Sequence, residues 1–378
     1  MIFFYFLSFL LNYIATCTVF RENDLNLLKT RLPTVYIVPI PSRFNFDCCS
    51  NTTGMDNLDQ IFHKWLLTSY CRIVDDPLKA DIYFVPAYPS VCIQRRKIGW
   101  YDKVHHFFSG TADYKPFWID LDQTLAQFQN VSNEKSFILA PHPHHVPSGV
   151  NIDKKLRQVL DVRYGRLDSS LTPNGKDIFV PYKVSRNASE IIFSFESIAD
   201  QRKFSVYSPC KPAGGGNDDV RNWRTKVYNY LNTYPEMLAV NTFDKDFDSH
   251  LVSSDFCFIL PGDTASTSKL YKAMFAGCIP VIFYTYMEDL PFFDIVDWKK
   301  LAVLVSKHVI NIPTEFHKFL NEIQILRKSG TALKAFRSAI LNASFVFDWS
   351  TTSWPSPYHF TLLEFIRNDI WSRELLYQ

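Results

Sequence analysis

Residues 255–292 read DFCFILPGDTASTSKLYKAMFAGCIPVIFYTYMEDLPF, and this stretch decides the fold. Its apolar run at 256–260 is typical of a buried strand and ends at Pro261. A segment with helical spacing follows at 269–276, and a second apolar run lies at 279–283. A strand, a helix and a second strand in this order predict a βαβ unit with parallel strands.

The loop between the first strand and the helix is rich in hydroxyl side chains. It reads Asp-Thr-Ala-Ser-Thr-Ser over residues 263–268 and leads into Lys269. A helix start offers unpaired N–H groups and the positive end of the helix dipole, which suit an anion such as a diphosphate. A lysine there adds a charge-assisted contact. The same loop also fits ordinary N-capping by Thr264 or Ser266, so both interpretations stay open.

The pattern of strands and helices extends in both directions from this stretch. Further apolar runs typical of strands lie at 35–38, 81–85, 137–140, 178–180, 191–195 and 301–305. Further segments with helical spacing lie at 58–70, 220–231, 314–328 and 358–376. Residues 163–177 are polar, with Pro173 and two glycines, and separate the two halves. The sequence therefore predicts two successive α/β lobes, which bind ligands outside the carboxyl ends of their parallel strands.

Composition excludes several classes of protein. Of the 378 residues 47% are hydrophobic, which excludes an intrinsically disordered chain. The 40 Lys+Arg and 38 Asp+Glu leave a net charge of +2, too small for the electrostatic footprint of a nucleic-acid-binding protein. The length predicts two domains of about 150 residues each with additional segments.

The N-terminal segment indicates the secretory pathway. Residues 2–20 carry no charge and are nearly as long as the ~20 residues that cross a bilayer as a helix. A cleaved signal peptide is the alternative, because Ala15 and Cys17 form an A-x-C arrangement of small residues. Both interpretations place the rest of the chain in the secretory lumen. Four glycosylation sequons agree with that compartment, at Asn51, Asn130, Asn187 and Asn342.

Eight cysteines also fit an oxidising compartment. We expect one or two disulfides in the N-terminal half, with connectivity left open, from Cys48, Cys49, Cys71 and Cys92. No spacing typical of a zinc site is present, and no metal ligands are assigned. Asp-x-Asp, which fits a metal-dependent donor site, occurs at 120–122, 244–246 and 246–248, but this short pattern is also typical of solvated helix ends.

Several motifs together resemble the exostosin-like family of inverting glycosyltransferases. In the stretch quoted first the match is carried by Gly262-Asp263-Thr264, Leu270, Ala273 and residues 277–282. Asp289-Leu290-Pro291-Phe292 and Asp297-Trp298 resemble the elements that follow in the family. Asp76-Pro77 with the run 80–86, and residues 176–181, are similar to upstream motifs. The resemblance spans roughly residues 35–345.

The resemblance implies a fold and a division of the chain. The fold is α/β of the GT-B type: two Rossmann-like lobes whose parallel sheets face a central cleft, with a C-terminal helix packing back. Five segments follow from it: a signal anchor or signal peptide at 1–21, a short stem at 22–32, an acceptor lobe at 33–175, a nucleotide-sugar-binding lobe at 176–345 and a C-terminal helical segment at 346–378.

The resemblance also implies an activity. The chain would move a sugar from a nucleotide-sugar donor, expected to be a UDP-sugar, to a glycan or glycoprotein, with inversion at the anomeric carbon and no required cofactor or metal. The donor-binding residues carried over are Gly262, Asp263, Thr264, Thr267 and Lys269. Asp289 would line the sugar or ribose end of the donor as a second catalytic residue. Among the histidines at 142, 144 and 145, His142 is the expected catalytic base, since histidine titrates near working pH.

Members of this family are typically lumenal, which sets the expected location and partners. We expect a single-pass type II protein of the Golgi or endoplasmic reticulum membrane, or a secreted protein if the N-terminal segment is cleaved. Its partners would be the donor, the acceptor, the membrane and a related transferase in a hetero- or homo-oligomer, with no nucleic acid.

The chain departs from the family's pattern at four places. Lys269 stands where an Arg is common, which replaces bidentate phosphate recognition by a point charge. Residues 135–137 read Lys-Ser-Phe instead of Asp-His-Phe, His142 precedes a proline instead of an aspartate, and Glu196 replaces a glycine. These departures keep two alternatives open: a non-catalytic partner subunit of an active transferase, and a glycan-binding protein that uses no donor.

Overall fold

The computed structural model describes these parts of the chain: residues 32–45, 58–88, 121, 123–125, 136–139, 157–160, 178–184, 201–212, 218–240, 244–261, 267–284, 290–293 and 295–364. Their contacts divide into two compact units. One covers the described residues up to Ser185 together with those from Trp349 onward, and the other covers those between Arg186 and Asp348. We call them the N-terminal and C-terminal units.

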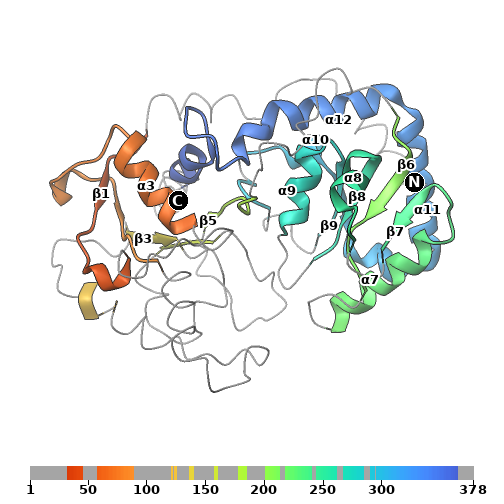
Figure 1. Ribbon diagram of the computed structural model, residues 1–378, viewed down its shortest axis with the longest axis horizontal. Coiled ribbons are helices and arrows are strands. Elements are labelled where there is room, and N and C mark those ends of the chain that lie inside the picture. The colour runs from red at the N-terminus through yellow and green to blue at the C-terminus, as the bar shows by residue number, and fades with distance from the viewer. Residues whose placement is uncertain are drawn as a thin grey trace, which may run out of the picture. The chain divides into compact units, whose positions relative to one another are not determined.

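The N-terminal unit contains a parallel sheet whose described strands follow the order of the sequence. They are β1 (Val35–Ile37), β2 (Ile82–Phe84), β3 (Ser136–Leu139), β4 (Arg157–Leu160) and β5 (Ile178–Phe179). Helix α3 (Leu58–Ser69) connects the first two (Figure 1). The short 3₁₀ turns η1 (Ser42–Phe44) and η4 (Pro77–Lys79) lie beside them, and Asp76 caps η4 by accepting from the Leu78 amide.

The core of the N-terminal unit includes the end of the chain. Helix α3 buries Phe62 and Trp65, which lie at helical spacing on one face. The Trp65 ring stacks on Tyr358, with centroids 4.8 Å apart, and Phe62 packs against both Tyr358 and Phe84. Tyr358 belongs to a helix over 357–364. The expected return of the C-terminal segment onto the fold is therefore confirmed for the described part of that segment, up to residue 364.

The C-terminal unit contains a second parallel sheet, in the order β10-β9-β8-β6-β7. Its strands are β6 (Phe204–Ser208), β7 (Met237–Ala239), β8 (Ser254–Ile259), β9 (Ile279–Tyr284) and β10 (Val303–Ser306). The chain leaves β6 toward one edge through β7 and returns to the other side of β6 as β8. The direction of winding thus reverses between β6 and β8, which is the topological switch point of a doubly wound sheet.

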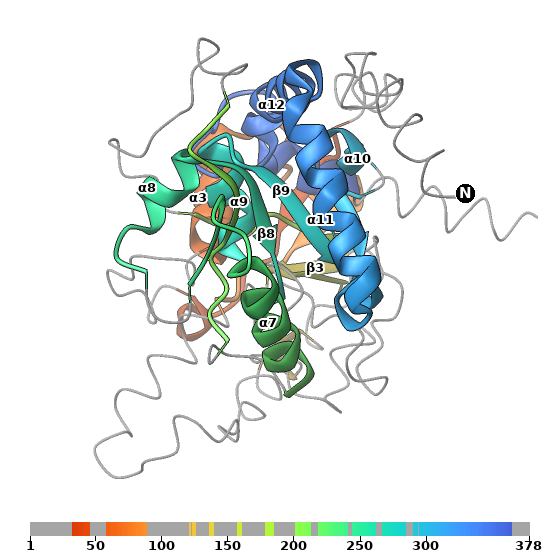
Figure 2. The same cartoon turned by 90° about the vertical axis from the view of Figure 1, so that its right-hand side faces the viewer.

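Helices cover both faces of this sheet (Figure 2). They are α7 (Asp218–Leu231), α8 (Phe247–Val252), α9 (Ser268–Phe275), α10 (Trp298–Leu301), α11 (Pro313–Lys328) and α12 (Gly330–Ala343), with the 3₁₀ turns η11 (Lys307–Asn311) and η12 (Ser344–Val346). The connections β6-α7-β7 and β8-α9-β9 run in opposite directions along the sheet, so right-handed crossovers place α7 and α9 on opposite faces. Tyr230 of α7 stacks on Phe316 of α11, and α12 contacts α9, so α11 and α12 also lie on opposite faces.

A buried ionic network ties β8 to the last two helices. The Asp255 carboxylate, fully buried, accepts from Arg337 Nη2 at 2.7 Å and from Arg327 Nε at 2.8 Å. Arg202 donates its backbone amide to the same carboxylate at 3.1 Å. Arg337 also donates to the Gly277 carbonyl at 3.0 Å. Removing one partner of such a buried ion pair lowers the free energy of unfolding by about 3–5 kcal/mol. This network therefore holds α11 and α12 in place on the sheet.

The cysteines differ in part from the expectation. Cys257 of β8 and Cys278, which directly precedes β9, form a disulfide 21 residues apart within the C-terminal unit. Cys71, which we expected to contribute to a disulfide in the N-terminal half, carries a free thiol and is exposed. The other three cysteines of that expectation, at 48, 49 and 92, lie outside the described residues.

The α/β class with two parallel sheets is confirmed, and some element bounds differ. The expected βαβ unit is β8, α9 and β9. The apolar run 301–305 is divided, because α10 extends to Leu301 and the strand β10 begins at Val303. The strand expected at 191–195 and the N-terminal segment lie outside the described residues. Within the part that the structure describes, no helix is long and apolar enough to span a bilayer.

Candidate functional site

The candidate site lies at the carboxyl ends of β6 and β8, on either side of the switch point. Lys269, in the first turn of α9, donates from Nζ to the Pro209 carbonyl at 2.9 Å. Its ammonium also lies 3.7 Å from Cys210 Sγ. Pro209 and Cys210 directly follow β6. The positive charge of Lys269 is therefore held where open parallel sheets bind their ligands.

The start of α9 is organised by Thr267. Its hydroxyl accepts a hydrogen bond from the Lys269 amide at 3.4 Å, and its backbone is extended, as expected of an N-cap. The helix begins at Ser268, so the cap is Thr267 and neither of the two residues, Thr264 or Ser266, that we considered for this role. A helix start beside a lysine is a favourable position for an anion.

The end of β8 is held by a second cationic side chain. Arg224 of α7, only 4% exposed, donates to the Pro261 carbonyl from Nη2 at 2.6 Å and from Nε at 3.2 Å. The neighbouring Leu260 carbonyl lies 3.7 Å from the buried thiol of Cys210. Contacts thus run from Arg224 through the end of β8 to Cys210 and Lys269 at the end of β6.

The structure brings together two of the predicted site residues. Thr267 and Lys269 lie side by side at the start of α9. The remaining predicted residues lie outside the described part of the chain: Gly262, Asp263, Thr264, Asp289 and His142.

Sequence reasoning missed Arg224 and Cys210 as neighbours of the site. Arg224 precedes the run of hydroxyl residues by more than thirty positions, on a helix that shows no functional motif. A signal existed in the helical pattern, because Arg224 lies beside Trp223 and between Val220 and Val227, on the face that the structure buries. An arginine at a buried position of an amphipathic helix indicates a specific acceptor.

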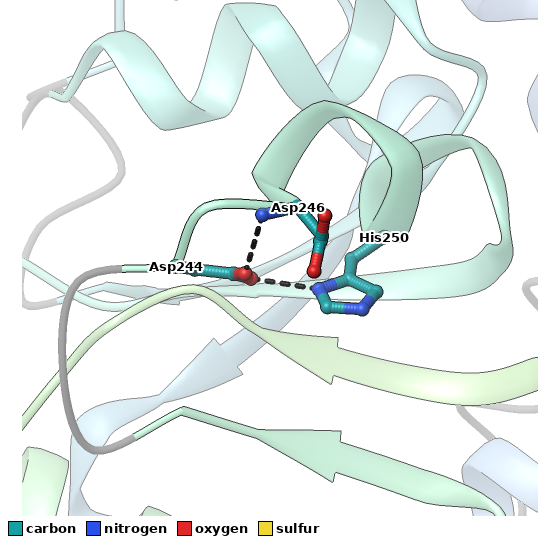
Figure 3. A group of neighbouring side chains, drawn as sticks. All are labelled: Asp244, Asp246 and His250. Atoms are coloured by element: carbon teal, nitrogen blue, oxygen red, sulfur yellow. Dashed lines mark hydrogen bonds and ion pairs between the residues drawn. The ribbon is translucent and has the colours of Figure 1, made fainter.

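A second cluster of titratable groups lies between β6 and α8 (Figure 3). Asp244 Oδ2 accepts from the Tyr207 hydroxyl and lies 2.8 Å from His250 Nδ1, while Asp244 Oδ1 accepts from the Asp246 amide at 3.0 Å. Ligand atoms of Asp244, Asp246 and His250 lie within 4.8 Å of one another, as a divalent cation would require. The three hydrogen bonds to Asp244 are enough to hold these side chains together, so their closeness does not by itself indicate a bound cation.

The electrostatics of this cluster follow from the same contacts. Burial acts to raise the pKa of Asp244, but hydrogen bonds from Tyr207, His250 and the Asp246 amide outweigh it, and the pKa lies below its usual value. Burial, together with the hydrogen bond to Asp244, raises the pKa of Tyr207 far above its ordinary range. The cluster therefore carries an ionised aspartate and a neutral tyrosine at neutral pH.

In the comparison with known proteins, a family model matches the region that contains the site. Residues 217–322 match the model of the exostosin GT47 domain. This range includes α7 with Arg224, the end of β8, and α9 with Thr267 and Lys269.

Curated relatives extend the resemblance along the chain. Mouse exostosin-like 1 is 39% identical over 59 residues, which are 16% of this chain and 8% of that protein. A probable arabinosyltransferase ARAD1 of Arabidopsis thaliana is 24% identical over 68% of this chain and 55% of its own length. A probable glucuronosyltransferase 47 A of Physcomitrium patens is 21% identical over 82% of this chain and 70% of its own length. The chain thus spans about half of the Arabidopsis relative and a small part of the mouse one.

Among solved structures, a crystal structure of Anabaena Alr3699/HepE in complex with UDP-glucose matches with a TM-score of 0.31 and 11% identity, over 88% of this chain and 98% of the other. A glycotransferase of kitacinnamycin matches with the same TM-score, 10% identity and a coverage of 91% and 99%. The resemblance expected from the motifs is confirmed: residues 217–322 match the exostosin GT47 domain model, and the chain is similar to proteins named as exostosin-like or as probable glycosyltransferases.

Proposed function

We propose that the chain is a glycosyltransferase whose C-terminal unit binds a nucleotide-sugar at the switch point between β6 and β8. The observation that carries this proposal is the position of Lys269, whose ammonium is anchored on the Pro209 carbonyl beside the capped start of α9. The ammonium has three N–H donors, of which the Pro209 carbonyl takes one and Cys210 Sγ lies near another. A donor diphosphate fits this environment, because it offers acceptor oxygens and negative charge.

The reaction we propose is a single displacement at the anomeric carbon of the donor. The acceptor hydroxyl oxygen forms a bond to that carbon while the bond to the diphosphate breaks, so the configuration inverts. The hydroxyl proton passes to a base, for which His142 is the candidate, and the electron pair leaves with the nucleoside diphosphate. Lys269 and the N–H groups at the start of α9 stabilise the charge that develops on the leaving group.

We propose further that this chemistry requires no cofactor and no metal beyond the donor itself. The leaving diphosphate is neutralised in part by Lys269 and by the helix start. Gly262, Asp263 and Thr264, in the loop before Thr267, are proposed to contact the donor through their backbone N–H groups. Asp289 is proposed at the sugar or ribose end of the donor. A UDP-sugar is the proposed donor class.

The acceptor is proposed from the family resemblance, and the location from the resemblance and the N-terminal sequence. The acceptor is a glycan or glycoprotein in the Golgi or endoplasmic reticulum lumen. The uncharged segment 2–20 anchors the chain as a type II membrane protein or is cleaved on secretion. Association with a related transferase is proposed as the oligomeric arrangement.

A nucleotide screen tests this proposal directly. Purified full-length protein is heated with each UDP- and GDP-sugar, and the unfolding temperature is recorded. A ligand at 100 times its Kd stabilises the folded state by about 2.7 kcal/mol. For units of this size that corresponds to a rise of about 5–10 °C. The stabilising donor is then incubated with glycan acceptors, and transfer is measured. If no nucleotide-sugar raises the unfolding temperature, the proposed function is wrong.

A further inference from the structure

Arg224 and Lys269 hold the two strand ends of the switch point in the same way. Lys269 of α9 donates to the carbonyl of Pro209, after β6, and Arg224 of α7 donates to the carbonyl of Pro261, after β8. Helices α7 and α9 belong to opposite faces of the sheet. Tyr230 of α7 stacks on Phe316 of α11 on one face. On the other face, α9 contacts α12, and Tyr271 of α9 packs on Phe347, which directly follows η12.

We propose that Arg224 is a positioning residue for the donor diphosphate site. It fixes the end of β8, and through Cys210 it fixes the distance between that end and Lys269. This inference deepens the proposed function and rests on it, because Lys269 is the group that meets the diphosphate. It assigns to α7, a helix with no recognised functional motif, a specific part in donor binding.

The physical argument begins with the proline. Pro261 has no N–H, so its carbonyl is the only polar backbone group by which this residue can be held. Arg224 supplies two donors to that single oxygen and is itself 4% exposed. Placing a guanidinium at a buried position is costly unless it is hydrogen-bonded, so its presence here indicates a geometric requirement at the end of β8.

The second step connects this anchor to Lys269. The Leu260 carbonyl, one residue before Pro261, lies 3.7 Å from Cys210 Sγ, and the same sulfur lies 3.7 Å from Lys269 Nζ. Cys210 is 2% exposed, so the three groups pack without intervening solvent. Because interiors are close-packed, a shift of the β8 end is transmitted to the ammonium and changes its distance from a bound phosphate.

Three substitutions separate positioning from a direct charge contact. In R224Q the amide nitrogen occupies nearly the place of the arginine Nε, so a neutral donor to the Pro261 carbonyl is kept while the charge is lost. R224K keeps the charge but replaces the planar guanidinium by one mobile ammonium, and R224M keeps neither a charge nor a donor. We expect R224M to weaken UDP binding about tenfold or more, and R224Q to weaken it only two- to threefold, since tenfold corresponds to about 1.4 kcal/mol.

The experiment is calorimetric titration of UDP into the full-length protein and each variant, with urea unfolding measured in parallel. V227A is the matched control, because Val227 is fully buried on the same helix and is absent from the contacts around Pro261 that the structure describes. It is expected to lower stability as R224M does while UDP affinity stays within twofold. Restored affinity in R224Q relative to R224M, at similar stability, supports the positioning role.

Two results overturn the inference. In the first, R224Q binds UDP as weakly as R224M does, while R224K binds UDP normally. This result would show that the charge of Arg224 contacts the diphosphate directly. The other is an equal loss of UDP affinity in V227A and R224M, which attributes the effect to general destabilisation of α7. Both presuppose that the unmodified protein binds UDP. If it binds neither UDP nor GDP, the proposed function fails, and that result is distinct from either of these.

Discussion

Replacing Lys269 by methionine is the sharpest test of the switch-point site. Methionine preserves most of the apolar stem and removes the ammonium that donates to the Pro209 carbonyl at 2.9 Å. A hydrogen bond that involves a charged group contributes about 1.5–3 kcal/mol, and a partly exposed lysine such as this one belongs near the lower half of that range. Since 1.4 kcal/mol is tenfold, we expect UDP affinity to fall about 10- to 30-fold.

The assay for Lys269 is titration of UDP at two salt concentrations. The difference between the wild type and K269M should shrink at high salt, because screening weakens the contact of the ammonium with the diphosphate. K272M is the matched control: Lys272 lies on the same helix and loses the same charge, but its Nζ lies over the Phe247 ring, 5.4 Å from the centroid. K269R should retain binding, since an arginine recognises phosphate in a bidentate manner.

Two outcomes would refute this reasoning. K269M binding UDP within twofold of the wild type would show that the ammonium at the end of β6 does not meet the diphosphate. An equal loss in K272M and K269M would show that only the net charge of α9 matters, and the specific anchor on Pro209 would then be irrelevant.

Three further predictions can be tested, the first drawn from the sequence and the other two from the structure. H142A should lower turnover sharply while donor affinity stays near normal, and unchanged turnover in a transfer assay would remove His142 as the base. D255N should lower the free energy of unfolding by about 3–5 kcal/mol in urea, because it removes the charge of a fully buried carboxylate that pairs with Arg337 and Arg327. D246N, at an exposed site, should lower it by less than about 1 kcal/mol. Burial lowers the pKa of His63 and His359 to about 4, below the ordinary 6.5. Between those values the unfolded chain binds more protons than the folded one, so stability should fall as pH decreases from about 6.5 to about 4. Exchanging both histidines for glutamine should flatten that slope in pH-dependent unfolding, and an unaltered slope would contradict the assignment.

The sequence predicted the central part of the C-terminal sheet because that part is strongly apolar. The run at 256–260 and the run at 279–283 are long and uninterrupted, and both are strands in the structure. The adjacent strand β6 escaped prediction because its five residues include two serines, and Ser205 and Ser208 are buried only through hydrogen bonding and pairing with neighbouring strands. Such pairing depends on segments distant in sequence and has no local signature.

Of the site residues, those at the start of α9 could be predicted from the sequence, and those contributed by α7 and by the end of β6 could not. Lys269 and Thr267 follow a strand and open a helix, so their position could be inferred from local order. Arg224 could not be, because its acceptor, the Pro261 carbonyl, is 37 residues away and is brought close only by the packing of α7 on the sheet. The same holds for Cys210, whose neighbours come from β8 and α9.

The return of the C-terminal segment to α3 has a consequence for the order of folding. Within the described residues the C-terminal unit is an insertion into the N-terminal unit, because the chain leaves the N-terminal unit after Ser185 and re-enters it at Trp349. Trp65 then finds its stacking partner Tyr358 almost three hundred residues later. During synthesis, part of the aromatic core of the N-terminal unit therefore stays exposed until the inserted unit and the segment with Tyr358 have left the ribosome. Removal of residues 349–378 should accordingly leave the N-terminal unit dependent on chaperones, even though every described strand of its sheet precedes the cut.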